Sequence, residues 1–198
     1  MGHCWEGELP KEIGQLTELR VLSAPEDSYF GGRFPKEIAH CTKLKKIAFD
    51  SSVGGFALDA FPPEMENLQQ LEEISLGGDF ADHPQDNVGG PNDSMLQVVV
   101  LLKNLRSLSL RSFHFNTIPP ELGTLTNLEY LDLEYNELTG PIPKELINLK
   151  KLEVLYISNN QLTGCVPKAL YDKFGKDTFC YQSHKDSDEQ YDLPPCSE

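Results

Sequence analysis

The sequence lacks a long apolar run and an excess of basic charge. Its longest apolar stretch, VVVLL at residues 98–102, is far shorter than the roughly 20 residues that a helix needs to cross a bilayer. Lys and Arg number 17 against 31 Asp and Glu, a formal net charge of −14. Such a chain repels nucleic-acid phosphates. These features exclude membrane insertion of this segment and nucleic-acid binding, and they favour a monomer kept soluble by its charge.

Sequence motifs of catalysis are also missing. The five histidines are scattered, and there is no GxSxG, HExxH, P-loop or GxGxxG motif in a suitable context. Pairs of carboxylates carry no information in so acidic a chain. We therefore expect no enzyme, no catalytic residue, no metal and no cofactor.

The N-terminus, MGHCWEGELP, has neither the basic nor the apolar segment of a signal peptide. A secreted or cell-surface location would therefore require a leader that this sequence does not show. The five cysteines are an odd number, so at least one is unpaired within the chain.

What the sequence does contain is a repeat. LTNLEYLDLEYNELTGPIPKEL from Leu125 aligns with LKKLEVLYISNNQLTGCVPKAL from Leu149, a spacing of 24 residues. The same frame begins at residues 16, 41, 68, 102, 125 and 149, after a half repeat at residues 5–13. We predict a repeat domain over residues 1–170, with an insertion at 77–94, and a C-terminal cap over 171–198.

The pattern within one repeat predicts its local structure. In LxxLxL the apolar residues alternate, which favours a short strand with one buried face. An Asn or Asp further on can turn inward and bond the backbone of the turn; the candidates are Asp27, Asp79, Asn136 and Asn160. Pro then begins a 3₁₀ or α segment. Stacked units predict an α/β solenoid with a concave parallel sheet and short 3₁₀ or α segments on its convex side.

LTGPIPKEL and LTGCVPKAL resemble the leucine-rich repeat family, in its plant-type subclass LxxLxxLxLxxNxLxGxIPxxLxx, over about residues 5–170. That subclass is known from receptor-kinase ectodomains and polygalacturonase inhibitors, and similar units occur in secreted bacterial and algal proteins. The resemblance implies a curved, extracellular, protein-binding scaffold, but it names no ligand.

Two parts of the chain depart from the repeat. The insertion carries carboxylates and a histidine, which we interpret as a solvated loop, with a cation site as the alternative; these residues are Asp79, Asp82, His83, Asp86 and Asp93. After it, Asp93 or Ser94 can cap a helix whose inner side carries Met95, Val98, Val99 and Leu102.

In SFHFNTIPPEL, Phe113 stands at the Asn position. We expect Phe113 and Phe115 to fill the core; an exposed aromatic lip that includes His114 is the alternative. Cys41 occupies a leucine position, where we expect it to act as a small, buried, unreactive apolar residue.

The tail from Cys165 to DLPPC resembles the C-terminal closure of secreted repeat proteins of this type. The resemblance implies a disulfide between Cys165 and Cys196, and hence an oxidising compartment. Pairing of Cys180 with either cysteine stays open, and a thiol or zinc cluster is a weaker alternative, because no CxxC unit is present.

The residues that alternate with the strand leucines should face the concave surface. In the last two repeats three of them are tyrosines, which favour binding hot spots, although tyrosine is also common in ordinary strands. The predicted ligand-binding residues are Arg111, Tyr130, Asp132, Glu134, Tyr135, Tyr156, Ser158 and Asn159.

The predicted partner of this face is a protein with a basic surface, or a cell-surface glycan. Two other functions remain: inhibition of a cell-wall polygalacturonase, and a structural or display role in a larger surface protein.

Overall fold

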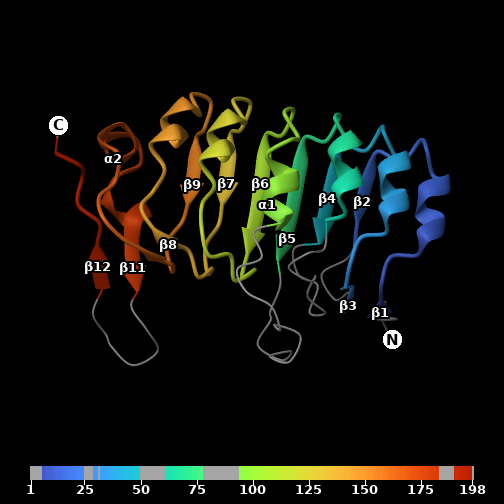
Figure 1. The fold of residues 1–198 in the computed structure, drawn as a ribbon, viewed down its shortest axis with the longest axis horizontal. Helices are drawn as coiled ribbons and strands as arrows, with labels where there is room; N and C mark the ends of the chain where they lie inside the picture. The colour runs from blue at the N-terminus through green and yellow to red at the C-terminus, as the bar shows by residue number, and fades with distance from the viewer. Residues whose placement is uncertain are drawn as a thin grey trace.

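One parallel sheet runs through the molecule. The computed structural model describes residues 6–24, 29–30, 32–49, 61–77, 94–182 and 190–197. Six parallel strands lie side by side in chain order (Figure 1). They are β2 (Val21–Ser23), β4 (Lys46–Phe49), β5 (Glu73–Gly77), β6 (Ser107–Arg111), β7 (Tyr130–Asp132) and β9 (Val154–Tyr156). Each repeat contributes one strand, so the parallel order follows from the repeat.

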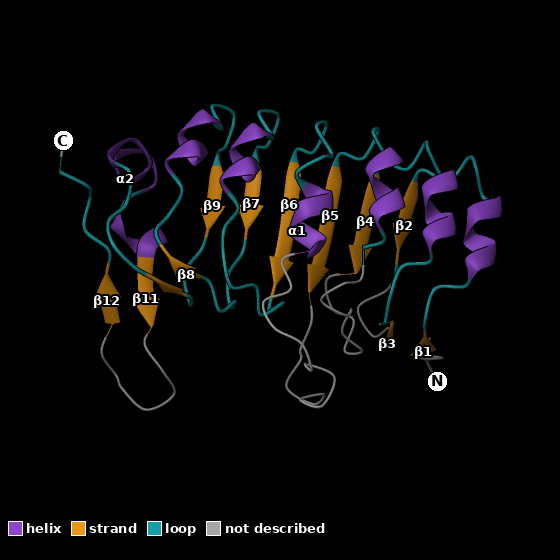
Figure 2. Cartoon of the chain, in the orientation of Figure 1, coloured by secondary structure: helices purple, strands orange, loops and turns teal. Residues whose placement is uncertain are grey.

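Short helices line one side of the sheet, the side that the sequence predicted to be convex (Figure 2). They are η1 (Lys11–Gln15), η2 (Lys36–His40), η3 (Pro63–Asn67), α1 (Ser94–Val99), η5 (Pro120–Thr124) and η6 (Lys144–Asn148). Each of the five 3₁₀ helices follows a proline in extended conformation, whose fixed φ favours the helix start. The predicted α/β solenoid is confirmed. Among the described residues, no helix has the length and apolar character to span a membrane.

Two smaller sheets complete the repeats, and two helices and a pair of strands lie at the C-terminal end. β1 (Glu6–Gly7) pairs with β3 (Tyr29–Phe30), and β8 (Thr139–Gly140) pairs with β10 (Gln161–Leu162), both in parallel. Beyond them lie α2 (Lys168–Phe174), η7 (Lys176–Phe179) and the antiparallel pair β11 (Cys180–Gln182) and β12 (Gln190–Asp192).

The leucines that recur at fixed positions in the repeats form one continuous core between the sheet and the helices. Phe113 and Phe115 are fully buried within it, with their rings stacked at 5.6 Å. Their predicted role as core residues is confirmed, and the alternative of an exposed aromatic lip is wrong. Cys41 is also fully buried, its Sγ lies 3.3 Å from the carbonyl of Ile13, and burial raises the pKa of its thiol.

Helix α1 follows the sequence prediction closely. It begins at Ser94, and the predicted inner residues Met95, Val98, Val99 and Leu102 are all buried. The insertion that precedes it, apart from its ends Gly77 and Ser94, lies outside the described residues, and so do Asp27 and the five residues of the alternative cation site.

Buried asparagines hold the turns that follow the strands. Asn136 makes five backbone hydrogen bonds, two of them accepted by its Oδ1 and three donated by its Nδ2. The partners are the N–H groups of Phe113 (2.9 Å) and Phe115 (3.2 Å) and the carbonyls of Leu110 (2.9 Å), Leu133 (3.0 Å) and Glu134 (3.2 Å). The repeat that has Phe113 in place of asparagine is therefore held by the asparagine of the next repeat.

The C-terminal elements are tied to the last repeat. Cys165 and Cys196, the pair that the resemblance implied, are joined by a disulfide. Beside it, Val166 donates to the carbonyl of Pro194 and accepts from the N–H of Cys196, each at 2.8 Å. The side chain of Cys180 lies outside the described residues, so the structure does not test whether Cys180 pairs with another cysteine.

The convex helices pack so closely that Gly123 has no room for a side chain. A Cβ at this position would lie 2.3 Å from the carbonyl oxygen of Glu145. Gly123→Ala is therefore expected to lower the free energy of unfolding by about 1–3 kcal/mol, measured by urea denaturation. The exposed Glu121 in the same helix provides the control, since Glu121→Ala should change stability by no more than about 0.5 kcal/mol. Equal stability of the two variants would show that η5 and η6 separate easily.

Candidate ligand-binding surface

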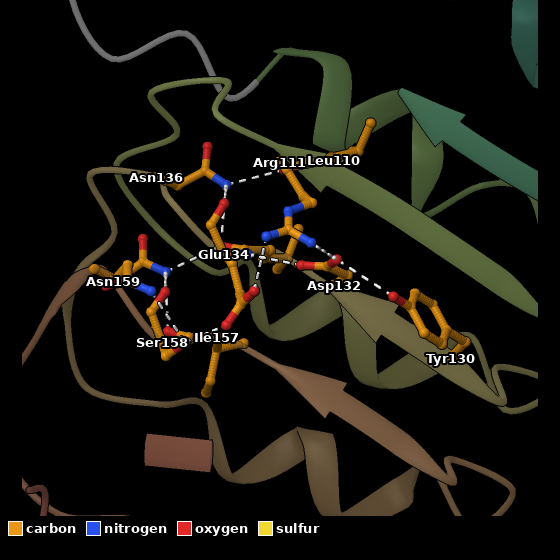
Figure 3. A network of polar contacts seen from close by, with 11 residues as sticks. Leu110, Arg111, Tyr130, Asp132, Glu134, Asn136, Ile157, Ser158 and Asn159 are labelled. Atoms are coloured by element: carbon orange, nitrogen blue, oxygen red, sulfur yellow. Dashed lines mark hydrogen bonds and ion pairs between the residues drawn. The ribbon is translucent and has the colours of Figure 1, made fainter. Parts of the chain in front are cut away.

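Three neighbouring strands assemble the predicted binding residues. In the sheet register Ser107, Tyr130 and Val154 are level, and so are Ser109, Asp132 and Tyr156. Just beyond these strands come Glu134, Tyr135, Ser158 and Asn159. We call the following set the tyrosine surface: Arg111, Tyr130, Asp132, Glu134, Tyr135, Tyr156, Ser158 and Asn159. Figure 3 labels Arg111, Tyr130, Asp132, Glu134, Ser158 and Asn159 of this set. The structure brings all eight together.

Arg111 joins β6 to the segment that leaves β7. Its guanidinium lies 3.4 Å from Asp132 Oδ2 through Nη1 and 3.1 Å from Glu134 Oε2 through Nη2. The same guanidinium lies over the ring of Tyr135, 5.3 Å from the ring centroid. One planar cation thus contacts two carboxylates and one aromatic face, which a guanidinium does better than an ammonium.

Both carboxylates are engaged within the chain. Asp132 Oδ1 accepts the N–H of Glu134 at 3.0 Å, and its Oδ2 accepts the hydroxyl of Tyr130 at 3.3 Å. Glu134 Oε1 accepts the hydroxyl of Ser158. The side chain of Asp132 is 1% exposed and that of Glu134 is 16% exposed. Neither carboxylate therefore stands free in solvent, contrary to the simple expectation that these side chains face outward.

Two tyrosine rings dominate what a ligand would meet. Tyr135 is 54% exposed and Tyr156 is 45% exposed. Tyr130 is partly buried and packs edge-on against Tyr156, with 5.9 Å between ring centroids. Asn159 donates to Ser158 Oγ at 3.3 Å and extends the polar border. Tyr130 therefore supports the surface, while Tyr135 and Tyr156 form its outer part.

The backbone of Tyr135 adopts an unfavourable conformation. Ser112, Tyr135 and Asn159 stand at the same place in successive repeats, and all have positive φ, at 60°, 56° and 56°. Asn and other small polar residues tolerate this left-handed region, whereas for an aromatic residue it costs about 1–2 kcal/mol. The position before the inward asparagine was the sequence feature that could have revealed this strain. Strain of this kind gathers at functional sites and motivates a hypothesis of function.

The environment shifts two of the titrating groups. Burial raises the pKa of Asp132, although the N–H of Glu134 and the charge of Arg111 oppose the shift. Burial and the neighbouring Asp132 raise the pKa of Tyr130 to about 12. The Tyr130 hydroxyl therefore stays protonated and donates at neutral pH.

The raised pKa of Asp132 predicts the direction in which stability changes with pH. The unfolded chain ionises this group near pH 3.9, whereas the folded chain holds its proton to higher pH. The stability of wild type relative to Asp132→Asn should therefore be greatest below about pH 3.9 and fall as pH rises through the folded pKa. Urea denaturation between pH 3 and pH 7 measures this difference. A relative stability that rises with pH would contradict the assigned burial.

Comparisons with known proteins agree with this architecture. Residues 103–162 match a family model described as leucine rich repeat. No curated protein matches the sequence. Among solved structures, the plant peptide hormone receptor RGFR1 in complex with RGF2 is similar, with 24% identity and a TM-score of 0.63 over 85% of this chain and 25% of that one.

Two further structures are similar. The ectodomain of the membrane receptor kinase GASSHO1/SCHENGEN3 from Arabidopsis thaliana, in complex with Casparian strip integrity factor 2, has 25% identity and a TM-score of 0.56, covering 87% of this chain and 23% of that one. A leucine-rich repeat protein of Leptospira interrogans has 30% identity and a TM-score of 0.52, covering 82% and 43%. The chain spans about a quarter of the length of the first two.

The family model and these structures share one architecture, a solenoid of stacked leucine-rich repeats. The fold is that of a leucine-rich repeat solenoid, and the resemblance seen in the sequence is supported by the family model over residues 103–162. Within the described ranges, no group of three or more His, Cys, Asp and Glu side chains could hold a metal ion.

Proposed function

We propose that this chain is an extracellular, monomeric recognition module that binds a peptide or protein segment on its concave face at the tyrosine surface. The observation that carries the proposal is Tyr135, an aromatic residue kept at a left-handed position and still 54% exposed. Core packing does not explain why an aromatic residue stands at this position, because the ring lies outside the core. Contact between the ring and a ligand would explain it.

The chemistry of the surface supports this role. Tyrosine offers a large contact area with few rotatable bonds, so little entropy is lost when a ligand covers it. Tyr135 is further held by the guanidinium of Arg111, and Tyr156 by the ring of Tyr130. Rings that are fixed before binding give more affinity per contact.

Two further observations support an extracellular protein ligand. The Cys165–Cys196 disulfide suits an oxidising compartment. The similar Arabidopsis ectodomain is described in complex with Casparian strip integrity factor 2.

A displayed library of randomised peptides, selected on the wild-type protein, tests the proposal. The affinity of the enriched peptides for Tyr135→Asn and for Tyr156→Ser is expected to fall at least tenfold in each case, as for hot-spot tyrosines. Because asparagine tolerates positive φ, Tyr135→Asn should unfold at or above the wild-type temperature. Lost binding with retained stability separates function from folding.

Leu101 provides a matched control, since it is 42% exposed and belongs to the turn after α1, away from the tyrosine surface. Leu101→Ser should leave the affinity of the enriched peptides unchanged. A library that yields no peptide with lower affinity for the tyrosine variants would contradict the proposed site.

A further inference from the structure

The tyrosine surface contains its own counter-ion. Asp132 and Glu134 contribute two negative charges, and Arg111 contributes one positive charge in contact with both. All four carboxylate oxygens have partners: the N–H of Glu134, the hydroxyls of Tyr130 and Ser158, and the guanidinium of Arg111. Each carboxylate oxygen of Asp132 and Glu134 is therefore already bonded within the chain, without a basic group from a partner.

Among the described residues of the neighbouring strands, few other charges face this network. On β5, Glu73 is level with Ser107 and is paired with Lys46 at 2.7 Å. On β9 the outward residues are Val154 and Tyr156, which carry no charge at neutral pH. On β6 they are Ser107 and Ser109, and Arg111 follows them. The pair Arg106 and Glu129, at 3.2 Å, precedes β6 and β7 at the opposite strand end. The local balance therefore depends on Arg111.

We propose that Arg111 determines the specificity of the tyrosine surface: it occupies the place that a basic side chain of a partner would take. The surface then accepts an uncharged peptide segment through Tyr135 and Tyr156 and disfavours a basic one. This inference deepens the proposed function and rests on it for the identity of the ligand as a peptide. It replaces the earlier expectation of a basic partner surface.

The energetics follow from contact with the guanidinium. A partner's lysine would have to displace Arg111 from two acceptors and from the Tyr135 ring, or approach it as a like charge. Like-charge contacts of this kind suppress wrong partners at an interface. An uncharged segment meets no such barrier at the exposed rings.

Two variants of equal net charge test whether Arg111 masks the carboxylates of Asp132 and Glu134 from a basic partner. Arg111→Gln and Lys150→Gln both change the formal charge from −14 to −15. Lys150 is exposed in the turn between η6 and β9, so its loss changes only the overall field. The probe is a fluorescent hexapeptide with two lysines, read by fluorescence anisotropy at low salt.

Arg111→Gln is expected to bind this probe at least tenfold more tightly than Lys150→Gln and wild type. Arg111→Gln with Glu134→Gln, which removes one unmasked carboxylate, should reverse most of the gain. Equal affinity of the two single variants would overturn the inference, and so would a gain that persists in the double variant.

Thermal melting establishes that each variant is folded before it is compared. If Arg111→Gln does not fold, Arg111→Lys takes its place, because an ammonium cannot span both carboxylates and lie on the ring as well. Tighter probe binding by Arg111→Lys than by wild type then supports the inference, and unchanged binding overturns it.

The peptide library separates this inference from the proposed function. Peptides selected on wild type should show no enrichment of Lys or Arg, whereas those selected on Arg111→Gln should. Enrichment of Lys or Arg on wild type overturns the role of Arg111. Failure to enrich any peptide on wild type counts against the proposed function alone, because the lysine probe still reports the masking.

Discussion

Asn136→Leu is expected to lower the free energy of unfolding by about 3–5 kcal/mol. Leucine matches asparagine in approximate size but makes no hydrogen bond, so it leaves two buried N–H groups and up to three carbonyls without this partner. Each buried polar group that loses its only partner costs about 1–3 kcal/mol. Urea or guanidinium denaturation monitored by circular dichroism measures the loss.

Asn160 offers an internal comparison for that variant. It also donates three bonds, to the carbonyls of Leu133, Ile157 and Ser158, but its Oδ1 accepts only from the N–H of Leu138. Asn160→Leu should therefore cost less than Asn136→Leu. The exposed Asn148, changed to alanine, should alter stability by less than about 0.5 kcal/mol. A smaller loss for Asn136→Leu than for Asn160→Leu would contradict the claim that the additional N–H bonded by Asn136 adds stability.

Removing the disulfide should have an effect of similar size. The double variant Cys165→Ala and Cys196→Ala opens a link between residues 31 apart in sequence. The chain-entropy model then gives a loss of about 3–4 kcal/mol, because the unfolded chain gains freedom. The loss should appear as a lower denaturation midpoint and as earlier proteolysis between residues 165 and 197, since the C-terminal elements lose their covalent tie.

Reducing agent provides the control for the disulfide. Wild type should lose stability in dithiothreitol, whereas the double variant should not respond. Cys41 is buried and unpaired, so Cys41→Ala tests whether another thiol contributes; it should remain sensitive to reductant. Equal response of wild type and the double variant to reductant would contradict the assigned role of the bridge.

The repeat made the fold predictable from the sequence. LxxLxL, the inward asparagine and the proline recur at a fixed spacing, and each has one local consequence that stacking reinforces. The departures were predictable where side-chain size decides the outcome: Phe113, at the asparagine position, and Phe115, which aligns with Leu138, are both buried. The second role of Asn136 was not, because a hydrogen bond across 21–23 residues leaves no local pattern.

The sequence predicted which residues belong to the candidate site, but not their burial, contacts or backbone conformation. Strand alternation identified Tyr130, Asp132 and Tyr156, because the sheet register follows from the repeat. Alternation could not foresee that Asp132 would be 1% exposed and in contact with Tyr130, Glu134 and Arg111. Strand alternation also does not report the positive φ of Tyr135, for which the position directly before the inward Asn136 was the available signal.

The inward asparagines bond mainly backward along the chain. Asn136 holds Leu110, Phe113 and Phe115, which were made 21–26 residues earlier, and Asn160 holds Leu133 and Leu138 from 22–27 residues earlier. During synthesis from the N-terminus, a repeat therefore stays unfinished until its successor leaves the ribosome. Shortening the protein from its C-terminus would undo the repeat before the cut as well as those removed. The last two repeats thus have a direction of assembly, in which each completes the repeat before it.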